Sequence, residues 1–266
     1  MTVVLASIAQ NGNAIIMASD RMLARASLTY QFEHDSPKIR QVNDYLIGYA
    51  GTTTFADDIV SHKYPTFKTM KEFIEEFSAF YIKYGNRLSS RVLLESVGLD
   101  LKTFNENPQK YPPFLQQKVY EKLGNAKLGV SFIICGFEQE QPQMYQVGEY
   151  GLFSTSHSIG YAAIGIGEPH VANFYMVNGF KFDTPLKEAI YFAYQAKRSA
   201  EIAGGVGECT DIYVLEKKKK PMCFKDGSKF VKDLNTIYEK HKGLTGTLFK
   251  KEILPELNKL ELEESK

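Results

Sequence analysis

Two apolar runs open the chain and flank a turn signal. Residues 3–9 and 13–19 are rich in aliphatic and β-branched side chains, and Gln10-Asn11-Gly12 lies between them. Asn-Gly between two such runs is the strongest short-range indication of a hairpin. The sequence therefore predicts that the chain begins with a β-hairpin.

A strand that leads into a helix is predicted next. Pro37 in Ser36-Pro37-Lys38-Ile39 suits only the start or edge of a strand. The apolar run Tyr45–Ala50 then ends at Gly51, and Thr52-Thr53-Thr54 followed by Asp57 has the pattern of a helix N-cap with a reciprocal acid. The predicted order is strand, glycine, capped helix.

The middle of the chain changes from a helical to a strand pattern. Between Met70 and Tyr84, aromatic and aliphatic residues recur at intervals of three and four, which predicts a helix that packs on a core. Residues 98–128 carry Asn and Pro residues that break regular elements before a short helical patch at 115–123, so this segment resembles an insertion. Residues 130–135 and 144–147 read as an antiparallel strand pair.

The last third of the main domain repeats this change. A short strand is expected within residues 160–167, a helix opens at Glu168-Pro169, and a second helix covers 186–196. Residues 211–215 form the last predicted strand. Blocks of strands and helices in this order fit an α+β layered sandwich better than alternating βαβ units.

Residues 216–266 are interpreted as a separate helical extension. Apolar stripes at 230–237 and 248–257 predict two amphipathic helices, which we expect to pack on their own domain rather than to capture a partner.

Composition narrows the function classes. The chain has 266 residues, of which 44% are hydrophobic, enough for a substantial core. A net charge of +1 gives no general field for nucleic acid or anionic lipid, so neither partner is expected. The sequence contains no apolar run of membrane-spanning length and no basic leader, and its odd number of cysteines, Cys135, Cys209 and Cys223, suits a reducing compartment. We expect a cytoplasmic protein.

Neither a metal nor a cofactor is expected. The histidines and cysteines show no spacing typical of a metal site, and Gly165-Ile166-Gly167 lacks the third glycine and the βαβ setting of a dinucleotide loop.

Thr2 is the candidate nucleophile. Removal of Met1 would leave this threonine as the chain terminus at the start of a strand. A terminal threonine combines a hydroxyl nucleophile with an α-amine of pKa near ~8 that can take up the proton of the hydroxyl. Threonine after the initiator methionine is common, so Thr2 alone indicates little.

Three further signatures follow Thr2 in order: Ala18-Ser19-Asp20-Arg21, Pro37-Lys38-Ile39, and Ala50-Gly51 before the helix. With them the chain resembles the catalytic β-type subunits of the proteasome and their bacterial and archaeal relatives, among the N-terminal nucleophile hydrolases. The likeness covers residues 2–215, with an insertion at about 98–128. It implies an α+β fold, a four-layer αββα sandwich, followed by a C-terminal helical appendage.

The resemblance also implies roles for four residues. Thr2 matches the family's nucleophile, Asp20 its carboxylate, Lys38 its buried ammonium and Gly51 the backbone donor of its oxyanion hole. A cation beside the terminal amine disfavours protonation of that amine, and a carboxylate compensates the buried cation. The ordinary alternatives are an ion pair of Asp20 with Arg21 facing a turn, a solvated Lys38 and a Gly51 that only begins a helix.

Several positions depart from the family pattern. Ile166 and Val206 stand where peptidases of the family usually carry serines, and Glu201 and Glu208 are the nearby candidates for an acid of that second motif. Asp211 matches a frequent family acid, although capping or turn stabilisation is the favoured role. These departures predict a divergent homologue, either standalone or differently assembled, rather than a standard ring subunit. The family likeness makes self-association the default.

The sequence thus predicts an N-terminal threonine hydrolase, a peptidase that acts on peptides or proteins through a threonine acyl ester. One alternative is a connectase-like peptide ligase with the same threonine, which an added amine would reveal by capturing the acyl group faster than water does. The other is a non-catalytic proteasome-like scaffold, which an unremoved Met1 would favour.

Overall fold

The computed structural model describes residues 2–24, 31–95, 98–125, 127–248 and 251. The chain divides into two compact units, Met1–Cys223 and Phe224–Lys266. Helices and antiparallel strands occur in separate blocks along the chain, so the protein belongs to the α+β class, as predicted.

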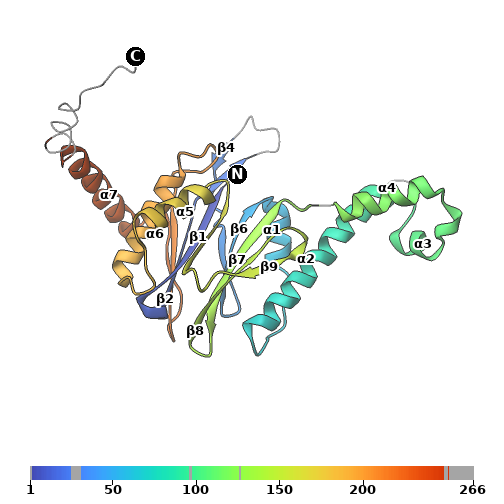
Figure 1. Cartoon of the computed structure of the whole chain (residues 1–266), viewed down its shortest axis with the longest axis horizontal. Helices are drawn as coiled ribbons and strands as arrows, with labels where there is room; N and C mark the ends of the chain where they lie inside the picture. The colour runs from blue at the N-terminus through green and yellow to red at the C-terminus, as the bar shows by residue number, and fades with distance from the viewer. Residues whose placement is uncertain (1, 25–30, 96–97, 126, 249–250, 252–266) are drawn as a thin grey trace, which may run out of the picture. The chain divides into compact units, whose positions relative to one another are not determined.

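The strands that the structure describes form two five-stranded sheets and a small ribbon (Figure 1). The first sheet has the order β10-β1-β2-β11-β12, with bounds β1 Val3–Ala9, β2 Ala14–Ser19, β10 Tyr161–Gly165, β11 Asp211–Glu216 and β12 Met222–Phe224. The second has the order β5-β6-β7-β8-β9, with bounds β5 Ile39–Val42, β6 Tyr45–Gly51, β7 Val130–Glu138, β8 Gln141–Val147 and β9 Phe153–Thr155. The ribbon pairs β3 (Met22–Ala24) with β4 (Gln31–Glu33).

Within the part of the chain that the structure describes, each large sheet has two helices packed on one face. Helices α5 (Glu168–Val177) and α6 (Leu186–Ala200) pack on β10, β1 and β2, whereas α1 (Thr53–Val60) and α2 (Met70–Leu93) pack on β6 and β7. The remaining faces of the two sheets contact each other through β1 and β10 against β6 and β7. In Figure 1 this order runs from α5 and α6 on the left to α1 and α2 on the right.

The predicted opening hairpin is confirmed. β1 pairs antiparallel with β2 from Val4↔Ser19 to Ala9↔Ala14, and Asn11 and Gly12 in the turn adopt left-handed φ values of 54° and 80°. Both strands are buried along their whole length. A strand covered on both faces needs apolar residues on both, which explains why the two runs do not alternate with polar residues.

The core between the sheets requires a glycine at position 48. Val4, Ala6 and Ile8 of β1 alternate inward and meet Ile39, Leu46 and Ala50 of the second sheet in one buried cluster. At Gly48 a Cβ would lie 2.5 Å from Val4 Cγ1 and 2.9 Å from Met17 Cε. The sheets can therefore approach this closely only where β6 has no side chain.

Gly48→Ala is expected to lower the free energy of unfolding by about 2 kcal/mol, because overpacking a filled core forces its neighbours to move. Urea denaturation measures the change. Gly204→Ala is the matched control, since a Cβ there meets nothing within 4 Å. Equal stability of the two variants would contradict the packing argument.

The predicted capping box at α1 is wrong. Thr52 is the N-cap residue, but its side chain makes no capping hydrogen bond. Asp57 instead forms an ion pair with Arg40 at 2.6 Å. The reciprocal cap occurs at α2, where Thr69 Oγ1 accepts the N–H of Glu72 at 3.1 Å and the Glu72 carboxylate accepts the N–H of Lys68 at 3.1 Å.

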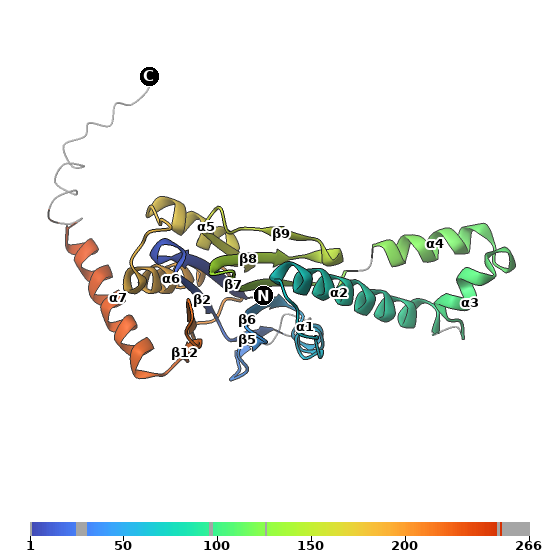
Figure 2. The ribbon, with the colours of Figure 1, turned by 90° about the horizontal axis from the view of Figure 1, so that it is seen from below.

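The 98–128 segment is more helical than the sequence indicated. It contains α3 (Leu101–Glu106) and α4 (Pro113–Gly124), of which only the second was predicted (Figure 2). Asp100 caps α3 by accepting the N–H of Thr103 at 2.8 Å. Leu94, Phe104 and Val119 form a small core that belongs to this segment and the end of α2.

The second unit contains α7 (Lys229–Leu248), which confirms the helix predicted over 230–237 and extends it. Val231 and Leu234 of its apolar stripe are buried, whereas Ile237 is exposed. The second helix predicted at 248–257 falls mostly outside the described residues. Among the residues that are described, no helix is long and apolar enough to cross a membrane.

Candidate active site

The fold brings Thr2, Asp20 and Lys38 to one end of the two sheets. The β1–β2 register places the start of β1 beside the end of β2, where the N–H of Asp20 meets the carbonyl of Val3 at 3.3 Å. Lys38 immediately precedes β5, and its carbonyl accepts the N–H of Tyr49 on β6 at 3.0 Å. Residues 36 positions apart in the chain thus become neighbours through the contact between the sheets.

Lys38 bridges the hydroxyl and the carboxylate. Its Nζ donates to Thr2 Oγ1, to Asp20 Oδ1 at 3.0 Å and to the carbonyl of Met22 at 2.6 Å. The Thr2 hydroxyl in turn donates to Asp20 Oδ1. All three side chains are buried, with Thr2 2%, Asp20 0% and Lys38 2% exposed. The alternative of a solvated Lys38 is therefore wrong.

Asp20 serves as the anchor of this cluster. Its Oδ1 also accepts the N–H of Val3, and its Oδ2 accepts the N–H groups of Met22 and Gly207, each at 3.0 Å. A carboxylate that accepts from donors on both oxygens is held in one orientation. Its role in the cluster is to compensate the Lys38 ammonium and to fix its position.

The pKa of Lys38 is lowered from its ordinary value. Burial is the main cause, because a low-dielectric interior disfavours the charged form, and the nearby Lys197 ammonium acts in the same direction. The Asp20 carboxylate opposes both effects through its charge and its hydrogen bond, and Glu33 adds a smaller opposing contribution. Asp20 is thus the main group that favours the charged form of Lys38.

Gly51 lies at the end of β6, next to this cluster. Its φ of +119° and the carbonyl of Gly129, which a Cβ would strike, both exclude other residues. Gly165 lies between Thr2 and the end of β6: a Cβ there would strike the carbonyl of Thr2 and lie 3.2 Å from the Cβ of Ala50. The four candidate residues therefore occupy one end of the stacked sheets.

The alternative pairing of Asp20 with Arg21 is also wrong. Arg21 binds Asp211 in a bidentate manner, with Nε at 2.9 Å from Oδ2 and Nη2 at 2.6 Å from Oδ1. Asp211 is fully buried and is the ion-pair partner of this guanidinium, a role that the sequence did not predict. This pair joins the start of β11 to the end of β2, next to Asp20.

Asp211→Asn is expected to lower the free energy of unfolding by about 3 kcal/mol, because it leaves the poorly exposed Arg21 guanidinium without its buried counter-charge. Urea denaturation at neutral pH measures this loss. Asp35→Asn is the control, since Asp35 binds the same guanidinium at 3.2 Å but is fully exposed. A measurable loss is expected only for Asp211→Asn, and similar losses in both variants would contradict the argument.

The two positions where serines were expected lie beside the site. Ile166 is 48% exposed between Gly165 and Gly167, and the N–H of Gly167 reaches the carbonyl of Thr2 at 3.4 Å. Val206 is buried next to Gly207, which donates to Asp20. The aliphatic residues at these positions bring no hydroxyl to the cluster.

Sequence reasoning missed Lys197 and Gly207. Lys197 is fully buried and binds Glu201, one of the two acids considered for the second motif, at 2.6 Å. The helical period of α6 contained a signal, because Lys197 falls four residues after Ala193 and three before Ala200, on the buried stripe.

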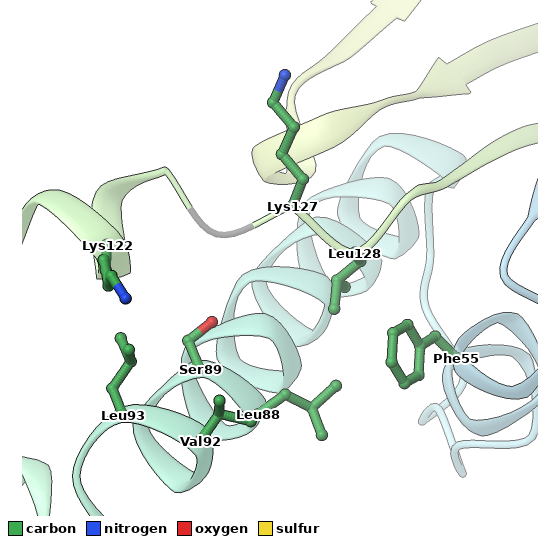
Figure 3. Close-up of a pocket in the computed structure, with 8 residues that line it drawn as sticks. All are labelled: Phe55, Leu88, Ser89, Val92, Leu93, Lys122, Lys127 and Leu128. Carbon is green, nitrogen blue, oxygen red and sulfur yellow. The ribbon is translucent and has the colours of Figure 1, made fainter. Parts of the chain in front are cut away.

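A separate cavity of about 330 Å³ lies between α2, α4 and the chain before β7 (Figure 3). It is lined by Phe55, Leu88, Ser89, Val92, Leu93, Lys122, Lys127 and Leu128. None of these residues belongs to the Thr2 cluster.

Across the described ranges, no group of three or more His, Cys, Asp or Glu side chains is arranged to hold a metal ion. The sequence matches no known protein-family model, and no curated protein matches it at a significant level.

Proposed function

We propose that the protein is an N-terminal threonine hydrolase that cleaves peptides through an acyl ester on Thr2. The observation that carries this proposal is the contact of one buried ammonium, that of Lys38, with both the Thr2 hydroxyl and the Asp20 carboxylate. A buried lysine that bound only the carboxylate would be an ordinary ion pair. Contact with a hydroxyl at position 2 is the feature that favours catalysis.

The packing of helices on one face of each sheet supports the same assignment. We propose that it is the four-layer αββα sandwich of the N-terminal nucleophile hydrolases. In this fold the site would lie where β1 and β5 begin and β2 and β6 end, which are the places of Thr2, Lys38, Asp20 and Gly51.

In the proposed reaction, Met1 is first removed. The Thr2 hydroxyl oxygen then attacks a peptide carbonyl carbon while its proton passes to the free Thr2 amine. Lys38 favours the unprotonated amine by its charge. The amine returns the proton to the leaving nitrogen, and the C–N bond breaks. Water then attacks the ester carbon and gives a proton to the same amine, the bond from that carbon to Thr2 Oγ1 breaks, and the amine returns the proton to Oγ1 as the acid product leaves.

The register of β6 supports Gly51 as the oxyanion donor. The N–H of Tyr49 points to β5, where it meets the carbonyl of Lys38. Every second N–H along a strand points to the same edge, so the N–H of Gly51 faces the same side. Because β5 begins only at Ile39, which pairs with Gly48, no β5 residue lies opposite Gly51.

The proposal is tested by reacting the purified full chain with a β-lactone and mapping the adduct by mass spectrometry. The expected result is a chain that lacks Met1 and carries one acyl group on Thr2. A chain that retains Met1 and does not react, even after treatment with methionine aminopeptidase, would instead support the non-catalytic scaffold.

A further inference from the structure

Lys197 of α6 is a buried cation that the proposed reaction does not use. Its Nζ donates to Glu201 Oε1 at 2.6 Å and to the carbonyls of Gly207 and Glu208, each at 2.7 Å. An ammonium has three N–H donors, so all of them are satisfied. The position is 0% exposed, and Glu201 supplies the compensating charge.

These hydrogen bonds define the course of the loop between α6 and β11. The loop has no regular secondary structure, and yet Gly205, Val206 and Gly207 are buried. Two successive carbonyls, of Gly207 and Glu208, converge on the Lys197 ammonium. The N–H of Gly207 then donates to Asp20 Oδ2 at 3.0 Å. Gly207 thus contacts Lys197 through its carbonyl and Asp20 through its N–H.

The opposite side of the loop is equally restricted. A Cβ on Gly207 would strike the carboxylate of Glu33 and lie 3.1 Å from Met22 Cβ. The same Glu33 carboxylate accepts the N–H of Cys209 at 2.8 Å. Gly207 is therefore held between the ammonium of Lys197 and the ribbon strands β3 and β4, with little freedom to move away from Asp20.

We infer that Lys197 is a positioning residue of the active site: it fixes the Gly207 N–H on Asp20 and thereby orients the carboxylate that holds the Thr2 hydroxyl and Lys38. This inference rests on the proposed function for its kinetic consequence. Lys197 does not touch the reacting atoms: its positioning effect passes through Gly207 and Asp20, and its charge also lowers the pKa of Lys38 directly. Stability alone does not explain a buried ammonium at position 197, because a well-packed apolar side chain at the same position would stabilise the fold equally well.

The kinetic test compares Lys197→Met with Lys187→Met, the same substitution at an exposed lysine of α6. In Lys197→Met the maximal rate constant of Thr2 acylation by a β-lactone is expected to fall about tenfold. The half-saturating lactone concentration and the final labelled fraction stay unchanged. Lys187→Met reacts like the unmodified protein. A purely structural role would lower the labelled fraction instead and leave the rate constant of the remaining molecules unchanged.

Lys197→Gln provides a rescue, because its amide keeps two N–H donors for the loop carbonyls. Its acylation rate constant is expected to lie between those of the unmodified protein and Lys197→Met. A rate constant in Lys197→Met equal to that of Lys187→Met would overturn the inference while leaving the proposed function intact.

Amide hydrogen exchange at Gly207, followed by NMR on the full chain, tests the inference independently of catalysis. Exchange at this amide is expected to be at least about tenfold faster in Lys197→Met than in Lys187→Met, because the N–H loses its fixed position. Unchanged exchange overturns the inference whether or not the protein reacts with the lactone. Faster exchange in a protein that never reacts supports the positioning of Gly207 and contradicts the proposed function alone.

Discussion

Thr2→Ala is expected to abolish acylation by a β-lactone and to lower peptide turnover by about 10⁴-fold or more, the loss typical of removing a nucleophile. The reason is that, among the described residues, the Thr2 hydroxyl alone both accepts from Lys38 Nζ and donates to Asp20 Oδ1. Rates of single-turnover acylation and intact mass measure the effect. Urea denaturation of the same variant checks that the fold is retained.

Two controls isolate the hydroxyl at position 2. Thr2→Ser keeps both the hydroxyl and the amine and is expected to remain reactive. Thr52→Ala removes a threonine at the start of α1 whose side chain makes no capping hydrogen bond, and it is expected to react like the unmodified protein. Label that persists on Thr2→Ala would show that another residue is the nucleophile and would end the assignment.

The fold elements that the sequence predicted are those that depend on local residues. The opening hairpin follows from two apolar runs and Asn11-Gly12, and its turn has the left-handed backbone that this pair favours. The predicted capping box at α1 is wrong because the partner of Asp57 is not a local residue. The sequence pattern pairs Asp57 with the start of α1, but Arg40 on β5, distant in sequence, binds it instead.

In the candidate site, too, the local sequence predicts some contacts but not those between residues distant in sequence. Thr2, Asp20 and Lys38 were found because they lie at the ends of predicted strands, and the structure brings them into contact. The partner of Arg21 was not found, because Asp211 lies 190 residues away and only the β2–β11 register brings the two together. A local pattern identifies residue types at strand ends, whereas the sheet order decides which of them pair.

The contacts of Lys197 are partly predictable from the local sequence and partly not. Its place on the apolar stripe of α6 follows from the helical period, and a lysine at such a place demands a buried counter-charge. Glu201, one turn later, was therefore predictable as its partner. The contact of Gly207 with Asp20 was not, because it depends on the course of an irregular loop that no periodicity describes.

Asp20→Asn is expected to lower the acylation rate constant by about 10²- to 10³-fold and to move the alkaline limb of its pH profile to lower pH. Burial lowers the pKa of Lys38, and the Asp20 carboxylate is the main opposing influence. Without that charge the pKa of Lys38 falls further. The ammonium that contacts the Thr2 hydroxyl is then lost at a pH where the unmodified protein still holds it.

Asp20→Asn also changes how the free energy of unfolding depends on pH. The sign of this change follows from the linkage between proton binding and folding. Because the pKa of Lys38 is lower in the folded than in the unfolded chain, the unfolded chain binds more protons between the two values, and stability rises with pH across that window. In Asp20→Asn the uncompensated ammonium destabilises the folded state most at low pH. The deficit in unfolding free energy relative to the unmodified protein should therefore shrink as the pH is raised through the range in which the buried Lys38 loses its proton.

Asp211→Asn is the matched control for this pH dependence. It makes the same change at an equally buried acid, but the cation that it leaves is Arg21, which keeps its charge throughout this range. Its deficit in unfolding free energy should therefore stay constant. If the deficit of Asp20→Asn is also constant with pH, and the alkaline limb of its acylation profile does not move, then the charge of Lys38 does not depend on Asp20. In that case the electrostatic basis of the proposed mechanism is wrong.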